Sequence, residues 1–192
     1  MNQITWFFVI TTGLLLASCN TSANRELGQS DQKSKRELKA DIAFMEDSVK
    51  SLSAEMNASA RGTLSRQELI NRLLLFYRAY PSDAYAAECL FKAQMIYSGL
   101  NAHEKSVAYG DTLLMKFPRY SNKYLVIESN IAALDIFISP RDTANIRHYY
   151  NMLLNDPSYP KSKKGEIQKR LKHLDLNIFD FSVLNEKLKT KK

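Results

Sequence analysis

The chain has 192 residues, enough for one folded domain with accessory segments, and its 45% hydrophobic and 24% charged residues are typical of a globular protein. With only 6 Gly and 5 Pro, it has long stretches without either residue, which favour an all-α protein over a loop-rich β fold. The formal net charge is +7, and residues 161–192 hold ten Lys or Arg against four Asp or Glu. Because the rest of the chain is nearly neutral, the charge does not indicate a nucleic-acid-binding protein.

The N-terminus has the pattern of an export signal that ends in a lipid-attachment site. Residues 4–16 form an apolar run that is too short for a membrane-spanning helix, which needs about 20 apolar residues. The run closes on Leu16-Ala17-Ser18-Cys19, which resembles the bacterial lipobox, although no Lys or Arg precedes it. The resemblance implies a signal peptide over residues 1–18 and acylation of Cys19, with palmitate among the chains. The alternative is a plain secretory signal in which Cys19 is incidental.

The residues after Cys19 favour the outer membrane. Asn20 follows the cysteine, whereas the inner-membrane retention signal of well-studied lipoproteins has an Asp there. Several acyl chains on one cysteine would anchor the protein permanently, since each buried CH₂ contributes about 0.8 kcal/mol. We therefore expect a bacterial protein that is lipid-anchored at the periplasmic face of the outer membrane, with residues 19–35 as a flexible polar tether.

Residues 36–60 predict a helix with a heptad pattern. Its apolar residues alternate in spacing between four and three, as in the a/d seam of a coiled coil: Leu38, Ile42, Met45, Val49, Leu52 and Met56. About three heptads are near the lower limit for an independent coiled coil, and Asp41 would face Glu46 in a parallel homodimer and repel it. Two interpretations stay open: a homo-oligomer through these six residues, or a helix that packs on the chain's own repeats.

Residues 65–181 show recurring helices punctuated by prolines. Tyr80-Pro81 recurs 37 residues later as Phe117-Pro118 and more weakly as Asp156-Pro157, and a proline cannot continue a helix. Ser65 and Glu68 predict a capping box at the start of this region, and Asp83 predicts an N-cap. Recurrence at this period predicts stacked helical hairpins. The expected helices cover residues 65–80, 83–99, 102–117, 121–137 and 142–155, with a last one from about 162.

These units resemble tetratricopeptide (TPR) repeats, which have two helices of roughly 14 residues each and a proline after the second. Ala93 and Ser106 stand where TPR helices keep small residues, and Asn130 takes the first of these positions in the next unit. In the same register, Gln94 and Tyr97 fall on positions that face the groove of a TPR stack. The resemblance therefore implies that Gln94 and Tyr97 contact a partner; the alternative for Tyr97 is a side chain packed between helices.

The lipobox, the heptad helix and the repeats together look most like two groups of bacterial envelope proteins. One is the TPR lipoprotein of the outer-membrane β-barrel assembly machinery, and the other is the periplasmic coiled-coil and TPR protein that accompanies the Tol-Pal system. The resemblance implies a scaffold that binds envelope proteins or peptides, in outer-membrane protein assembly or envelope maintenance. The alternative is an oligomeric structural spacer that uses the heptad helix, with repeats that bind no peptide.

No residue pattern supports an enzyme, a metal site or a cofactor. The three histidines, His103, His148 and His173, lie on different predicted helices without an HxxxH spacing. Cys89 lies among small and apolar residues, so we expect a buried, inert thiol. Residues 174–181 are expected to cover the last helix. Residues 182–192 are expected to form a basic tail, which either contacts anionic headgroups or an acidic partner, or serves only solubility.

Overall fold

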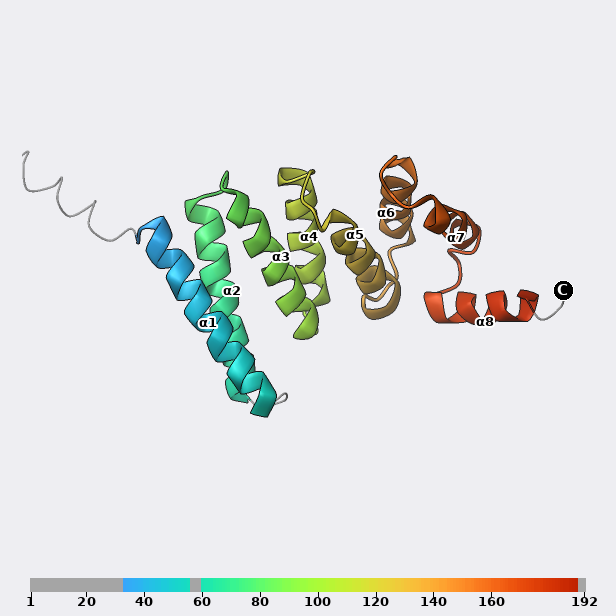
Figure 1. Ribbon diagram of the computed structural model, residues 1–192. Helices are drawn as coiled ribbons and strands as arrows, with labels where there is room; N and C mark the ends of the chain where they lie inside the picture. Colours follow the sequence, from blue (N-terminus) through green and yellow to red (C-terminus); the bar gives the residue numbers. More distant parts are fainter. Residues whose placement is uncertain (1–32, 56–59, 190–192) are drawn as a thin grey trace, which may run out of the picture. The chain divides into compact units, whose positions relative to one another are not determined.

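The computed structural model describes residues 33–55 and 60–189, and this part of the chain contains helices and turns without a β-strand, as predicted for an all-α protein. All of its helices belong to one compact unit, Lys35–Lys192. In chain order they are α1 (Lys35–Glu55), α2 (Ala60–Ala79), α3 (Ala84–Gly99), α4 (His103–Lys116), α5 (Lys123–Ala132), the π-helical turn η1 (Ala133–Phe137), α6 (Thr143–Asn155), α7 (Lys161–Leu171) and α8 (Ile178–Lys189) (Figure 1).

From α1 to α7, each helix packs against the next one along the chain, and the adjacent ribbons of α1 and α2 show the first of these pairings (Figure 1). Two hydrophobic clusters form the core. The first lies mainly among α1–α4 and includes the fully buried Phe76 and Leu90, whereas the second lies mainly among α5–α7 and includes Ile146 and Leu153. The chain therefore buries its apolar faces mainly between neighbours in sequence.

The heptad helix packs on the chain itself. Leu38, Ile42 and Met45 of α1 are buried in the first hydrophobic cluster, and Val49 is half-buried against the same cluster. α1 makes its main contacts with α2. Of the two interpretations of the heptad pattern, this arrangement corresponds to a helix that packs on the chain's own repeats. The sixth residue of the pattern, Met56, lies outside the described residues.

Two helix boundaries differ from the sequence predictions. α2 begins at Ala60, so the capping box predicted at Ser65 is wrong: Ser65 lies inside the helix, whereas an N-cap residue must have non-helical dihedrals. The good helix formers Ala60, Arg61 and Leu64 extend the helix by more than one turn. At the other end of the chain, α8 crosses the boundary expected between residues 181 and 182, because the apolar residues of 178–184 continue their helical pattern into the lysine-rich segment.

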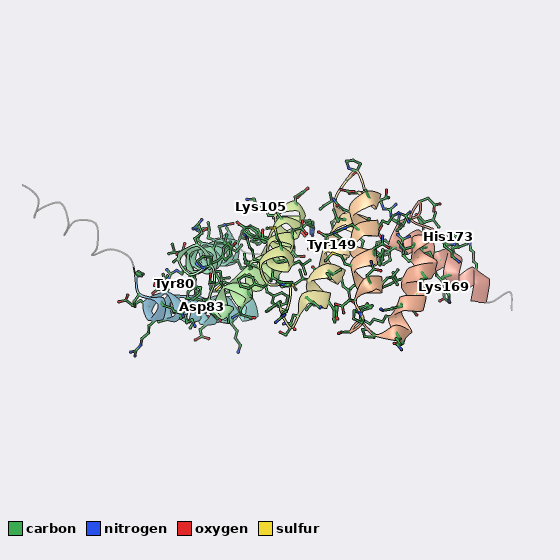
Figure 2. The ribbon with its side chains drawn as sticks, turned by 90° about the horizontal axis from the view of Figure 1, so that it is seen from above. Tyr80, Asp83, Lys105, Tyr149, Lys169 and His173 are labelled. Carbon is green, nitrogen blue, oxygen red and sulfur yellow. The ribbon has the colours of Figure 1, made fainter. Side chains whose placement is uncertain are left out.

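The three proline joints have the same backbone geometry. In each, the residue before the proline closes the last turn of a helix, as Tyr80 does by donating its N–H to the Phe76 carbonyl at 2.9 Å. Each joint then makes a turn with proline in its second position, where its fixed φ is favourable. The closing hydrogen bonds run from the backbone N–H to the carbonyl oxygen, from Asp83 to Tyr80 at 3.0 Å, from Tyr120 to Phe117 at 2.9 Å and from Tyr159 to Asp156 at 3.2 Å (the first is at the turn labelled in Figure 2).

The side chain of the residue that closes each turn also contacts an earlier helix: α1 for the first turn, α3 for the second and α5 for the third. Asp83 forms an ion pair with Lys35 of α1, the Tyr120 hydroxyl donates to Glu88 of α3 at 2.7 Å, and the Tyr159 hydroxyl donates to Glu128 of α5 at 2.9 Å. Asp83 also caps α3 by accepting from the Tyr85 N–H at 2.8 Å, as predicted. The Lys35 contact and this cap hold the pKa of Asp83 below its usual value. The sequence repeat at the prolines is thus a repeat of three-dimensional contacts.

Candidate functional site

The predicted partner-binding residues Gln94 and Tyr97 lie in the interior. Gln94 is 0% exposed and Tyr97 is 6% exposed, and the Tyr97 ring stacks on Tyr109 with a centroid distance of 5.3 Å. Gln94 is thus enclosed, whereas Tyr97, although little exposed, lines a pocket of about 410 Å³ together with residues of α2 and α4. That the two residues contact a partner stays a prediction. The TPR register placed both residues on α3, and α4 packs over the face of α3 that carries them.

Gln94 belongs to a buried polar network that joins four helices. Its amide nitrogen donates to Asn130 Oδ1 of α5 at 2.9 Å, and its backbone carbonyl accepts from the Ser106 hydroxyl of α4 at 3.0 Å. Asn130 Nδ2 in turn donates to the Tyr149 hydroxyl of α6 at 3.0 Å and to Asp111 Oδ1 of α4 at 3.3 Å. The network therefore leads from the buried face of α3 to the exposed carboxylate of Asp111.

A groove between α4 and α6 opens where this network reaches the surface. It has a volume of about 380 Å³ and is lined by Asp111, Thr112, Leu114, Met115, His148, Tyr149 and Met152 (Tyr149 is labelled in Figure 2). Met115, the residue before the last one of α4, is 69% exposed, so the groove presents a large apolar side chain to solvent. Methionine side chains are flexible and polarisable, and they suit surfaces that bind other proteins. The groove therefore combines an adaptable apolar wall with an anchored polar edge.

The polar edge consists of Asp111 and Tyr149. The Tyr149 hydroxyl donates to Asp111 Oδ1 in a short hydrogen bond. Burial of the ring, and then the neighbouring carboxylate, raise the pKa of Tyr149, so the hydroxyl keeps its proton throughout the neutral range. Because Asn130 donates to both residues, the orientation of the Asp111 carboxylate is held by two partners that are themselves buried. A rotamer held in this way loses little entropy when a ligand binds.

A second cavity, bounded by α5, α6, α7 and α8, is a weaker candidate. It has a volume of about 350 Å³, and its charged lining residues are Glu128, Lys163, Glu166 and Arg170. Three of these already have partners: Glu128 pairs with Lys163 at 3.0 Å, and Arg170 pairs with the buried Asp135 at 3.0 Å. These charges are engaged within the fold, which leaves the α4–α6 groove as the better candidate.

The remaining predictions concern the two cysteines, metal sites and membrane-spanning helices. Cys19 lies outside the described residues. Cys89 is fully buried, and burial raises the pKa of its thiol to about 12, which agrees with the predicted inert thiol. Within residues 33–55 and 60–189 no cluster of His, Cys, Asp or Glu could hold a metal ion. No helix of this part of the chain is both long and apolar enough to cross a membrane.

Sequence reasoning missed the pairing of Asp111 with Tyr149. The two residues are 38 positions apart, close to the 37-residue repeat. They therefore fall at corresponding places on α4 and α6, the second helices of two successive hairpins. A helical-repeat register could have aligned them, but Tyr149 had the appearance of an ordinary packing residue. Comparisons with known proteins add no independent guide, because no family model, no curated protein and no solved structure matches the chain.

Proposed function

We propose that this chain is a lipid-anchored scaffold of the bacterial envelope, whose TPR-like stack binds another envelope protein in the α4–α6 groove. The groove is the observation that carries the proposal, since it exposes Met115 beside a carboxylate held by a buried network. Large exposed apolar side chains beside ordered polar groups are typical of protein-binding surfaces. We see no arrangement of nucleophile and base in the groove that favours a reaction.

The TPR-like part of the proposal is supported by the joints. Three turns of the same hydrogen-bonding pattern, each linked to an earlier odd-numbered helix, are the contacts expected when one hairpin unit is repeated along a stack. Ala93 and Ser106, at the small-residue positions of the TPR register, are both buried in the contact between α3 and α4. These contacts favour a stack of hairpins over an irregular helical bundle.

The lipid anchor and the compartment rest on the tetrapeptide ending at Cys19. Metabolic labelling with a palmitate analogue tests them directly: the wild-type chain takes up label and the Cys19→Ala variant does not. Label that persists in the variant contradicts the anchor. On this basis, assembly of outer-membrane proteins or envelope maintenance is the proposed pathway.

The binding site is tested by photocrosslinking in the native envelope. A photoreactive residue at Met115 should capture a specific protein, identified by mass spectrometry. The matched control places it at Phe44 of α1, which is also 69% exposed but lies far along the chain from the groove. Equal capture of the same proteins from both positions contradicts a binding role for the groove.

The alternative, an oligomeric spacer, needs the heptad residues at an interface between copies. Leu38, Ile42 and Met45 are covered by the chain's own core, so this fold does not offer them to a second copy. We therefore do not favour the spacer.

A further inference from the structure

Asp111 has an acceptor oxygen that the fold does not use. Both hydrogen bonds to its carboxylate, from Tyr149 and from Asn130, end on Oδ1. Among the described residues, no hydrogen bond reaches Oδ2 and no basic side chain forms an ion pair with Asp111. With histidine neutral, Asp111 is also the one charged side chain among those that line the groove. The groove therefore offers one oriented, unpaired negative charge beside an apolar wall.

We infer that the α4–α6 groove binds a lysine side chain of the partner protein, with its ammonium group on Asp111 Oδ2. The inference rests on the proposed function and adds the chemistry of the partner. A lysine has a four-carbon stem that favours apolar contact while its charged head stays at a polar edge. Leu114, Met115 and Met152 line the apolar wall along which this stem would lie. The charge of the groove and the charge of the ligand are complementary.

Lysine fits this acceptor better than arginine. A carboxylate oxygen has two lone pairs, and Oδ1 already accepts from Tyr149 and Asn130. An arginine reaches its strongest geometry by donating to both oxygens of a carboxylate at once, which the two existing bonds prevent. The ammonium of lysine is a point charge that needs one oxygen only. Because only Oδ2 of Asp111 remains free to accept, the groove should bind a lysine more tightly than an arginine.

The buried network makes the charge effective. Asp111 is exposed, and an exposed ion pair is ordinarily worth little because two flexible side chains must be ordered. Here the carboxylate is already ordered by its bonds to Asn130 and Tyr149, and a partner segment lying on Met115 would exclude water from the pair. Both effects raise the contribution of a charge-assisted hydrogen bond.

A random dodecapeptide phage library, selected on the purified chain from Asn20 to Lys192, tests the inference without a known partner. This chain holds the whole compact unit and lacks Cys19. The test variant is Asp111→Asn, which keeps an acceptor for Tyr149 and removes the charge. The matched control is Asp47→Asn on α1, an exposed carboxylate whose loss changes the net charge equally. Thermal melts of all three proteins establish that they are folded.

We expect peptides selected on the wild-type chain and on Asp47→Asn to be enriched in lysine next to apolar residues, and this enrichment to be absent on Asp111→Asn. In the best synthetic peptide, replacing that lysine by glutamine or arginine should weaken binding to the wild-type chain about 10- to 100-fold, the range of a hydrogen bond to a charged group. The same replacements should leave binding to Asp111→Asn unchanged.

Two other outcomes separate the inference from the proposed function. The first outcome is a set of peptides that compete for the groove but lack lysine, or a selection on Asp111→Asn that yields the same lysine-containing peptides as the wild-type chain. Either result overturns the inference and leaves the scaffold function intact. Peptides that bind a Met115→Ser, Met152→Ser variant as tightly as the wild-type chain, or no selected peptide at all, overturn both.

Discussion

The side-chain amide of Gln94 donates to Asn130 Oδ1 at 2.9 Å in the interior of the protein and so joins α3 to α5. Gly110 of α4 faces this pair of amides: a Cβ atom at that position would lie 2.6 Å from Asn130 Oδ1 and 2.8 Å from Gln94 Nε2. Asn130 occupies a position where the TPR register has a small residue. The missing side chain of Gly110 provides the space that the larger Asn130 needs, so the glycine in α4 compensates for the departure from the pattern in α5.

The first prediction concerns Gly110. Gly110→Ala should lower the free energy of unfolding by about 1–3 kcal/mol, because the new methyl group overpacks a buried, hydrogen-bonded pair of amides. Gly165→Ala is the matched control, since it lies within α7 with no atom within 4 Å of the added Cβ. There the higher helix propensity of alanine should raise stability by up to about 1 kcal/mol. Urea denaturation measures both, and equal effects of the two substitutions contradict the prediction.

The second prediction concerns the buried carboxylate of Asp135. It lies in η1 and accepts hydrogen bonds from Arg141 at 2.5 Å and from Arg170 at 3.0 Å, and both arginines also donate to the Leu176 carbonyl. Asp135→Ala leaves the buried Arg170 without its counter-ion and should lower the free energy of unfolding by about 3–5 kcal/mol. Because the arginines hold the turn before α8, hydrogen exchange in residues 173–176 should accelerate.

The control for Asp135 is Glu68→Ala. Glu68 pairs with Arg72 at 2.9 Å on the surface of α2, and exposed pairs contribute about 0–1 kcal/mol. The prediction is contradicted if Asp135→Ala lowers the free energy of unfolding, measured by urea denaturation, no more than Glu68→Ala does.

The third prediction separates the two interpretations of the heptad pattern. Ile42 is 0% exposed within the core, so Ile42→Ala should lower the free energy of unfolding by about 2–5 kcal/mol. Phe44 on the same helix is 69% exposed, and Phe44→Ala should change it by no more than about 0.5 kcal/mol. The mass in solution of residues 20–192 should be that of a monomer for both variants and for the wild type. A wild-type oligomer that Ile42→Ala dissociates restores the spacer interpretation.

The fourth prediction concerns the Cys89 thiol. Its pKa of about 12 in the folded protein is raised mainly by burial, against about 8.5 for an exposed thiol. In residues 20–192, where Cys89 is the sole cysteine, labelling by a thiol reagent at pH 8 should be slower than in denaturant on the order of a thousandfold, from the difference in thiolate fraction. Since the folded pKa is the higher one, the stability from the neutral buried thiol is complete below pH 8.5 and declines as the pH rises toward 12. Rapid labelling of the native protein contradicts the assignment.

Local signals in the sequence were sufficient to predict where most of the helices begin and end. Pro81, Pro118 and Pro157 end helices because proline lacks an N–H and excludes the helical conformation of the preceding residue, and Asp83 begins one because its carboxylate accepts a backbone N–H. The prediction at Ser65 was wrong because the Ser-x-x-Glu pattern of a capping box also fits inside a helix, and α2 already begins at Ala60. These are effects within one or two turns of chain.

The candidate site depended on contacts that no local pattern contains. The heptad spacing of Leu38, Ile42 and Met45 required an apolar neighbour, but it could not decide between a second copy and α2. The TPR register placed Gln94 and Tyr97 on α3 without deciding what covers that face. Asp111 of α4 and Tyr149 of α6 meet across 38 residues because both helices pack against α5, whose Asn130 bonds to both side chains and occupies the space beside Gly110. The sequence by itself determined where the helices lie and where they end, because those signals act between near neighbours. Tertiary structure alone decided which polar groups are buried and which carboxylate reaches a groove, because burial depends on the summed packing of helices that are distant in the chain.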